Sequence, residues 1–226
     1  MLNRSGILLR RRTMNIKMLI TLVLVFSFSA VTIAAESDSA PSKEYKVKAA
    51  FVYNFIKFVD WPAPAGAAGD RKADRDAEPI TIGIIGKNPF GNAFDAVTEK
   101  GIQGREVAVK MFPGFEKNRV KYSQEGKTKY KYKDADALRE CEVLFISSSE
   151  NKFCKEIIES VKNSCVLTIG ETKDFLETGG IIKFVTEQKK VKFAINLISA
   201  EIARLSIRSR LLRLAKSVVQ EEGKNT

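Results

Sequence analysis

Histidine is absent from this sequence of 226 residues, and cysteine and tryptophan are scarce, with three and one. Without histidine there is no Ser-His-Asp triad, no Cys-His pair, no imidazole acid–base group and no histidine-ligated zinc. No apolar run reaches the roughly 20 residues that a membrane-spanning helix needs. Most hydrolase and metalloenzyme classes are therefore excluded, and we expect no catalytic site, no cofactor and no metal.

The N-terminus has the pattern of an export signal. Arg4, residues 10–12 and Lys17 are basic with no acidic residue among them, and the apolar stretch 18–30 and a run of small residues follow. A basic start, a short apolar core and a small-residue exit are typical of a secretory signal peptide. We predict a cleavable signal over residues 1–35, cut after Ala34 or Ala35; an uncleaved membrane anchor is the alternative.

The basic charge of the whole chain overstates that of the exported protein. The full sequence carries 38 basic and 27 acidic residues, a net charge of +11. Removing residues 1–35 removes five basic residues and no acidic one, which leaves 33 against 27, a net charge of +6. Because nucleic acid is absent from the exported compartment, we exclude it as a partner.

The cysteines enter an oxidising compartment in odd number, so at least one stays free or pairs between chains. Cys141 and Cys165 each directly precede a strand-like run, and Cys154 lies in a helical segment. Two alternatives stay open: an intrachain disulfide between Cys141 and Cys165, or three buried thiols.

Helical and strand-like segments alternate along the rest of the chain. Apolar residues recur at helical spacing over residues 44–59, and Trp61 followed by Pro62 ends that helix. Further helices are predicted over residues 90–98, 150–162, 197–204 and 208–219, and strands over 80–86, 105–112, 143–146, 166–169, 181–185 and 191–195. This order predicts one α/β domain over residues 36–226, with a mixed, mostly parallel sheet flanked by helices and a late β-hairpin.

Two polar segments interrupt this pattern as loop insertions. Residues 63–78 are rich in alanine, glycine and charge, and residues 121–133 are basic and contain tyrosine. The second segment has no apolar stripe, so we expect a solvated, hairpin-like insertion; a basic-aromatic binding patch is the alternative.

The polar motifs favour structural roles over catalytic ones. Gly83, Gly86 and Gly91 match neither a dinucleotide-binding fingerprint nor a P-loop, and indicate close strand–helix packing. Residues 147–149 and Asn196 precede helices and are expected to cap them. The acidic residues after the strand at 166–169 are Glu171, Asp174 and Glu177, for which capping and solvation are favoured over acid–base work. Arg204, Arg208 and Arg210 make the C-terminal helices basic, either as a solvated face or as a surface for an acidic partner.

Taken together, several segments resemble one protein family. They are the helix that ends in Trp61-Pro62, the run from Gly179 to Val185, and the stretch from Val191 to Ala200 with the closing LLRLAK. From about Tyr45 to Lys216 the chain resembles the YfiR family of periplasmic proteins. The resemblance implies a periplasmic repressor, not an enzyme, that binds the sensor region of an inner-membrane diguanylate cyclase and lowers cyclic-di-GMP signalling and biofilm formation. It also implies relief by an outer-membrane lipoprotein, and a homodimer.

Two hypotheses follow from these observations. The first is the periplasmic repressor, whose partner surface would include Trp61, Glu171, Asn196, Arg204, Arg208 and Arg210. The second is a periplasmic module that binds a small anion, nucleotide or amino acid at the strand ends near Gly86 and Gly170.

Overall fold

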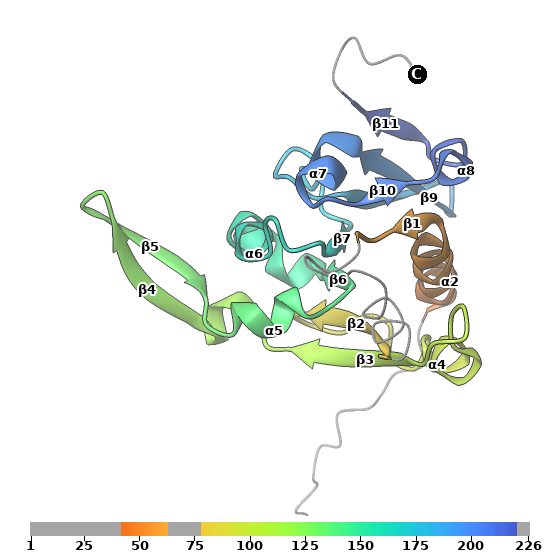
Figure 1. Cartoon of the computed structure of the whole chain (residues 1–226), viewed down its shortest axis with the longest axis horizontal. Helices are drawn as coiled ribbons and strands as arrows, with labels where there is room; N and C mark the ends of the chain where they lie inside the picture. The colour runs from red at the N-terminus through yellow and green to blue at the C-terminus, as the bar shows by residue number, and fades with distance from the viewer. Residues whose placement is uncertain (1–41, 63–77, 221–226) are drawn as a thin grey trace, which may run out of the picture. The chain divides into compact units, whose positions relative to one another are not determined.

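A seven-stranded sheet forms the centre of the fold (Figure 1). The computed structural model describes residues 42–62 and 78–220, so the expected signal peptide and nearly all of the insertion at 63–78 lie outside the described residues. The sheet order is β11-β9-β8-β7-β6-β2-β3. The strands are β2 (Ile80–Ile85), β3 (Val107–Phe112), β6 (Val143–Ile146), β7 (Leu167–Gly170), β8 (Ile182–Glu187), β9 (Lys190–Asn196) and β11 (Ser217–Val219).

The sheet is mixed and mostly parallel, as the sequence predicts. Strands β3, β2, β6, β7 and β8 pair in parallel, and β9 pairs antiparallel with β8 to form the late hairpin. The parallel part has the doubly wound order in which the chain crosses back over its first strand. The switch point of this order lies at the carboxyl ends of β2 and β6, where ligands bind in many open α/β sheets.

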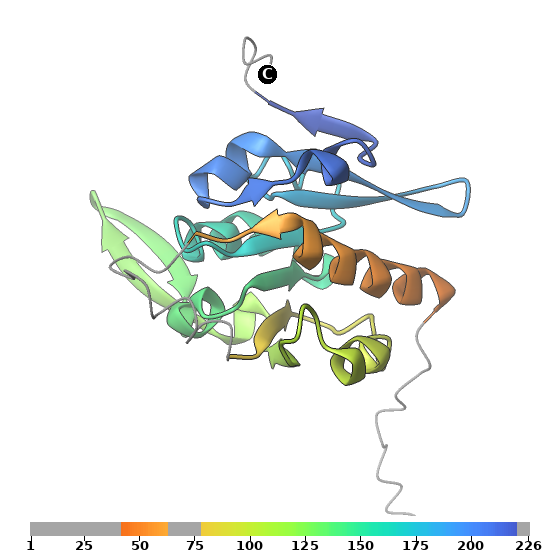
Figure 2. The ribbon, with the colours of Figure 1, turned by 45° about the vertical axis from the view of Figure 1, so that its right-hand side comes forward.

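Two apolar clusters cover the two faces of the sheet, between it and the helices whose ribbons Figure 2 shows beside it. Side chains alternate between faces along a strand, so Ile82 and Ile84 enter one cluster and Ile85 the other. The first cluster takes residues from α2 (Lys43–Phe58), α4 (Asp95–Lys100), α7 (Leu197–Ile202) and α8 (Ser209–Leu212). The second takes residues from α5 (Ala135–Arg139), η2 (Ser148–Phe153) and α6 (Cys154–Ser160), or from strands beneath them.

Helix α2 confirms the predicted N-terminal helix. The Ser42 hydroxyl caps it by accepting a hydrogen bond from the Tyr45 backbone N–H. The ring of Phe55 packs edge-on against Phe193 with centroids 4.9 Å apart, which fixes the helix on the sheet. After the helix, β1 (Val59–Asp60) pairs with β10 (Ser206–Ile207), a short ladder that the sequence did not reveal.

The basic insertion forms a hairpin of its own, as predicted. Strands β4 (Arg119–Gln124) and β5 (Lys127–Tyr132) pair antiparallel, follow η1 (Phe115–Lys117), and project beside the main sheet (Figure 1). Glu125 and Gly126 form the turn with left-handed φ values of 51° and 72°. Only Tyr132, at the base of the hairpin, is fully buried.

The expected helix over residues 208–219 is wrong in its second half. Helix α8 ends at Leu212, and β11 instead pairs in parallel with β9 at the edge of the sheet. The Lys216 N–H donates to the Phe193 carbonyl, which starts this ladder. Pairing with the free edge of β9 therefore determines the structure of residues 217–219 more strongly than their own helical pattern does. None of the helices within residues 42–62 and 78–220 has the length and apolar character to cross a membrane.

Candidate functional site

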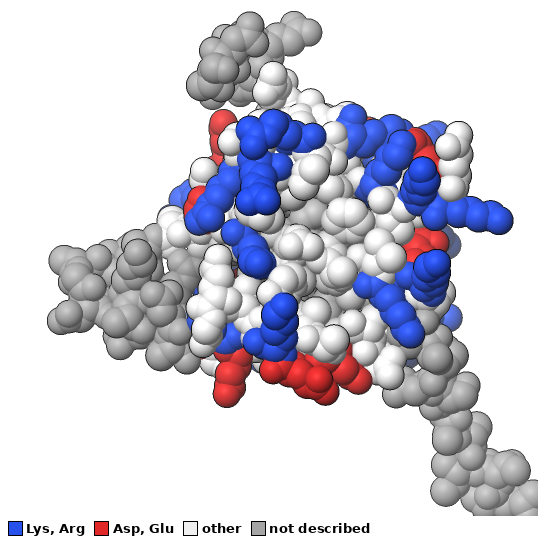
Figure 3. All heavy atoms as spheres, turned by 90° about the vertical axis from the view of Figure 1, so that its right-hand side faces the viewer, with Lys and Arg blue, Asp and Glu red and all other residues white. Residues whose placement is uncertain are grey.

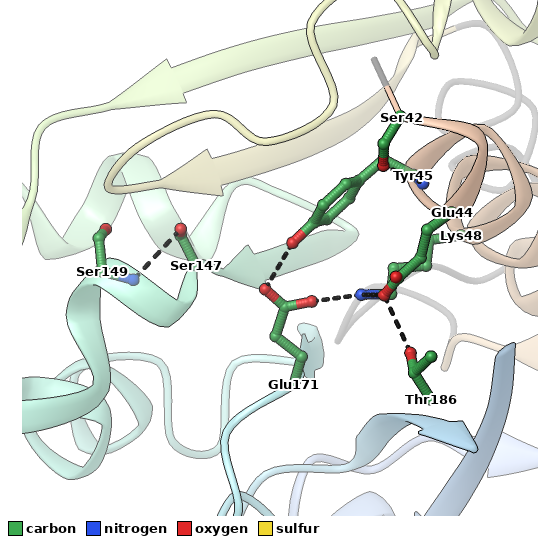
Figure 4. A network of polar contacts seen from close by, with 8 residues as sticks. All are labelled: Ser42, Glu44, Tyr45, Lys48, Ser147, Ser149, Glu171 and Thr186. Atoms are coloured by element: carbon green, nitrogen blue, oxygen red, sulfur yellow. Dashed lines mark hydrogen bonds and ion pairs between the residues drawn. The ribbon is translucent and has the colours of Figure 1, made fainter. Parts of the chain in front are cut away.

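Glu171 lies in a buried polar network at the carboxyl end of β7 (Figure 4). Its two carboxylate oxygens accept hydrogen bonds from the Tyr45 hydroxyl at 2.9 Å and the Lys48 ammonium at 2.6 Å. Lys48 also pairs with Glu44 at 2.7 Å, and Glu44 accepts a hydrogen bond from the Thr186 hydroxyl. The network ties the first two turns of α2 to strands β7 and β8.

Burial makes this network costly to disrupt. The Lys48 side chain is 4% exposed and that of Glu171 is 12% exposed. Burial, and then the hydrogen bond to Glu171, raise the pKa of Tyr45, and the bond from Lys48 lowers the pKa of Glu44. Because Glu171 is committed to two donors, it is not a free acid or base; Asp174 and Glu177 are exposed and lie outside the network.

The sequence pointed to Glu171 but to none of its network partners, of which Lys48 is the most buried. A signal was available: Lys48 lies four residues before Val52 and seven before Phe55, on the apolar stripe of the helix. A lysine on a buried stripe needs a buried anion, but its partner is 123 positions away in the sequence. Spacing along the helix therefore could not identify Glu171.

The switch point of the sheet is occupied by the chain itself. Gly86 follows β2 with φ of 91°, and a Cβ there would collide with Ser149 and Glu150. The buried Glu150 carboxylate accepts hydrogen bonds from the Ser149 hydroxyl at 3.0 Å and the Phe115 backbone N–H at 2.8 Å. Ser147 caps the helical turn that carries them, as expected.

An internal carboxylate thus fills the place where the second hypothesis put an anionic ligand. Glu150 takes up a backbone N–H that would otherwise face the crevice, and its negative charge repels a second anion. The other strand end, at Gly170, packs against the Phe175 ring. Neither strand end offers an anion the open, basic crevice that the sequence suggested.

Two of the three predicted arginines, Arg208 and Arg210, lie at the C-terminal end of α2. Arg208 forms a two-pronged ion pair with Asp60, with nitrogen–oxygen distances of 2.6 and 3.0 Å. This contact lowers the pKa of Asp60 and raises that of Arg208. The Arg210 guanidinium lies over the Phe58 ring, 5.4 Å from its centroid.

Further cations extend this region into a surface that we call the α2–α8 face: Tyr53, Lys57, Phe58, Lys100 and Arg210. The ammonium groups of Lys57 and Lys100 lie 5.2 and 5.7 Å from the centroid of the Tyr53 ring. Figure 3 views the side of the molecule where α2, α4 and α8 lie; lysine and arginine are spread across it, and acidic residues gather at its lower margin. Cations above half-buried rings form an amphipathic surface suited to an acidic partner.

The remaining predicted site residues have structural roles. Asn196 confirms its predicted cap by accepting a hydrogen bond from the Ser199 N–H, and its amide donates to the Leu176 carbonyl. Arg204 donates to the Asn163 carbonyl. Trp61 is half-buried against the first cluster, and its Nε1 has no hydrogen-bond partner within the described ranges.

The structure does not bring the predicted residues into one site. Glu171 contacts the first turns of α2, whereas Arg208 and Arg210 contact its last residues and the strand after it. At 1.5 Å per helical residue, these two groups are separated by about 15 Å along the helix axis. Of the predicted residues, Arg204, Arg208 and Arg210 are exposed, and the last two lie together at the end of α2.

The cysteines are free thiols, so the Cys141–Cys165 disulfide is not formed. The reason is their placement on opposite faces of the sheet. The Cys141 sulfur packs over Gly83, on the face of Ile85, whereas Cys165 packs against the cluster that contains Ile82. Burial raises the pKa of Cys141 to about 12.

Metal-ligating side chains do not converge in the part of the chain that the structure describes. No group of three or more cysteine, aspartate and glutamate side chains in residues 42–62 and 78–220 could hold a metal ion.

Comparisons with known proteins identify a family. The model of a family described as YfiR/HmsC-like matches residues 45–216. No protein of curated function matches the chain. A conserved domain protein from Vibrio cholerae is similar in structure, with a TM-score of 0.46, 12% identity, and coverage of 77% of this chain and 60% of that one. The ABC domain in complex with L-Trp from Streptococcus pneumoniae has a TM-score of 0.41, 15% identity, and coverage of 62% and 55%. The chain thus spans less than two thirds of either structure.

Proposed function

The chain belongs to the YfiR/HmsC-like family, and from that membership we propose that it binds the periplasmic sensor region of an inner-membrane diguanylate cyclase and holds the enzyme inactive. The match over residues 45–216 is the observation that carries the proposal, because the family is periplasmic and regulatory rather than catalytic. The basic and apolar N-terminus supports export, with residues 1–35 acting as a cleavable signal.

The α2–α8 face is the surface that we assign to the cyclase. It combines three cations with the rings of Tyr53 and Phe58, and it is built on a helix fixed to the sheet at both ends. A rigid surface keeps the entropic cost of binding low. To repress, the protein must bind the inactive state of the cyclase more tightly than the active state, and a tenfold bias requires about 1.4 kcal/mol.

The proposal also covers how the cyclase is released from repression and which oligomer of the repressor is active. We assign relief to an outer-membrane lipoprotein that competes for the repressor, and we propose a homodimer as the active form. Both follow from the family resemblance. Analytical ultracentrifugation of the purified protein tests the dimer, and a monomer at all concentrations would contradict it.

Deletion of the gene in a host that carries the partner cyclase tests the function. Cyclic-di-GMP should rise, and a plasmid copy of the wild-type gene should restore the low level. The variant Lys57→Glu/Arg210→Glu should accumulate normally but fail to restore it, because both reversals lie on the α2–α8 face.

A matched control reverses two exposed lysines elsewhere, Lys152→Glu/Lys173→Glu, and should complement as the wild type does. An unchanged cyclic-di-GMP level after deletion would refute the proposed repressor function. Equal complementation by both variants would instead remove only the α2–α8 face as the binding surface.

A further inference from the structure

The β4–β5 hairpin and the residues that flank it carry a net charge equal to that of the whole exported chain. Residues 117–133 contain seven basic residues and one acidic residue, a net charge of +6. This equals the net charge that remains after residues 1–35 are removed, so the rest of the exported chain is neutral overall. The hairpin pairs with no strand of the seven-stranded sheet. Apart from Tyr132, which is buried in the second cluster, the hairpin is solvated, and its charged residues are available to a partner.

Strand β5 pairs with β4 on one side only, and the register of that pairing determines which β5 residues direct their N–H and C=O groups toward the free edge. Its two-residue turn makes Gln124 and Lys127 the first hydrogen-bonded pair, so every second residue of β5 directs its backbone groups away from β4. Those residues are Thr128, Tyr130 and Tyr132. The Tyr132 N–H confirms this alternation, because it points away from β4 and donates to the Ser160 hydroxyl at 3.4 Å. In the described chain, the outward groups of Thr128 and Tyr130 have no such partner.

A groove lies between the hairpin and α6, and its lining includes Thr128 and Tyr130 of the free edge. Its volume is about 770 Å³, and its lining includes Tyr122, Tyr130, Lys131, Lys155 and Glu156. The two tyrosines are 37% and 39% exposed. Within the described ranges, neither Lys131 nor Lys155 has an ion pair, whereas Glu159 on the α6 side pairs with Lys162. In the part of the chain that the structure describes, Glu156 lines the groove without an ion pair and offsets one of the cations, which leaves an excess of positive charge from Lys129, Lys131 and Lys155. The groove therefore offers unpaired backbone groups, aromatic surface and net positive charge.

We propose that an extended acidic segment of a partner protein binds in this groove as a third strand on β5. Strand addition satisfies the outward groups of Thr128 and Tyr130, and alternate acidic side chains lie opposite Lys129 and Lys131 on one face of the ribbon. The side chains between them face Tyr130, which suits apolar residues. A peptide fits better than a lipid surface, because the unpaired groups line a groove beside α6 and not a flat face. This surface is separate from the α2–α8 face and does not depend on the cyclase assignment.

Fluorescence anisotropy with the exported protein tests the proposal. The probe is a short labelled peptide that alternates Glu and Val. One comparison peptide alternates Glu and Pro, which keeps the charge but lacks the N–H groups that a ladder needs. Another alternates Lys and Val. We expect saturable, salt-sensitive binding of the Glu-Val peptide, at least about tenfold weaker binding of the Glu-Pro peptide, and no binding of the Lys-Val peptide.

Variants of the protein separate the backbone contribution from the charge. Thr128→Pro removes one outward N–H at an edge position where proline is tolerated, and should weaken binding of the Glu-Val peptide about three- to tenfold. Thr128→Ala keeps the N–H and should bind as the wild type does. Lys129→Glu/Lys131→Glu should weaken binding more than tenfold and reduce its salt dependence. Circular dichroism verifies that each variant is folded.

Three results would overturn the proposal. Equal affinity for the Glu-Val and Glu-Pro peptides would show attraction of charge without strand pairing. Binding to phosphatidylglycerol vesicles with no binding of the peptide would assign the hairpin to a membrane surface. Failure of the Glu-Val peptide to bind at low salt would leave the groove without the proposed partner.

Discussion

Replacement of Lys48 by methionine should be among the most destabilising changes of a charged residue in α2. The ammonium of Lys48 lies 2.6 Å from Glu171 and 2.7 Å from Glu44, on a side chain that is 4% exposed. Methionine has nearly the same length and fills the same space, so the change removes charge without leaving a cavity. What remains is the Glu171 carboxylate, 12% exposed and held only by the Tyr45 hydroxyl.

The magnitude follows from this uncompensated charge. Breaking a buried ion pair by removing one partner costs about 3–5 kcal/mol in the free energy of unfolding. The reverse change, Glu171→Gln, should cost less, about 1–3 kcal/mol, because Lys48 keeps Glu44 and the new amide still accepts from Tyr45. Replacing both partners, as Lys48→Met/Glu171→Leu, leaves no buried charge and should lie within about 2 kcal/mol of the wild type.

Urea unfolding of the exported protein, at one fixed protein concentration, measures these differences. Lys46→Met is the matched control, because Lys46 lies on the same helix but is exposed, and it should change stability by less than about 0.5 kcal/mol. A cost below about 1 kcal/mol for Lys48→Met, or a larger cost for Glu171→Gln than for Lys48→Met, would refute the reasoning.

Two further predictions concern the thiols and acid stability. Because Cys141 and Cys154 are buried with raised pKa values, a maleimide at pH 8 should label only Cys165 in the native protein and all three cysteines in urea; rapid native labelling of Cys141 would contradict its burial. Arg208 lowers the pKa of Asp60 below its ordinary 3.8, so the pair stabilises the fold above that pH and the stabilisation is lost as pH falls through the lowered value. Asp60→Asn should therefore lower the melting temperature near neutral pH, and the difference from the wild type should shrink as the pH falls below 3.8; a constant difference would argue against the ion pair.

Local patterns predicted the elements that depend on nearby residues. The apolar stripe of α2, with Val52 and Phe55, follows from its 3.6-residue period, and the polar, tyrosine-bearing run at 121–133 proved to be a solvated hairpin. The caps at Ser147 and Asn196 were also predictable, because a cap bonds to an N–H two or three residues away. These features require no knowledge of distant parts of the chain.

The predictions that were wrong or missing concern residues whose structure depends on contacts with distant parts of the sequence. Residues 217–219 lie in a segment with a helical pattern but form a strand, because β9 presents an unpaired edge to them. The partner of Lys48 lies 123 positions away, and that of Arg208 lies 148 positions away. The sequence also suggested a crevice near Gly86, which the Glu150 side chain fills.

Composition and spacing along the chain were enough to predict the class of fold, the caps and breaks of its elements, the lack of imidazole chemistry, and the concentration of positive charge near one hairpin. Three features instead required the packed structure: the neutralisation of a buried lysine by Glu171, the placement of Cys141 and Cys165 on opposite faces of the sheet, and the free edge of β5 beside a groove. Those outcomes depend on which segments pack together, and packing is set by the burial of surfaces far apart in sequence.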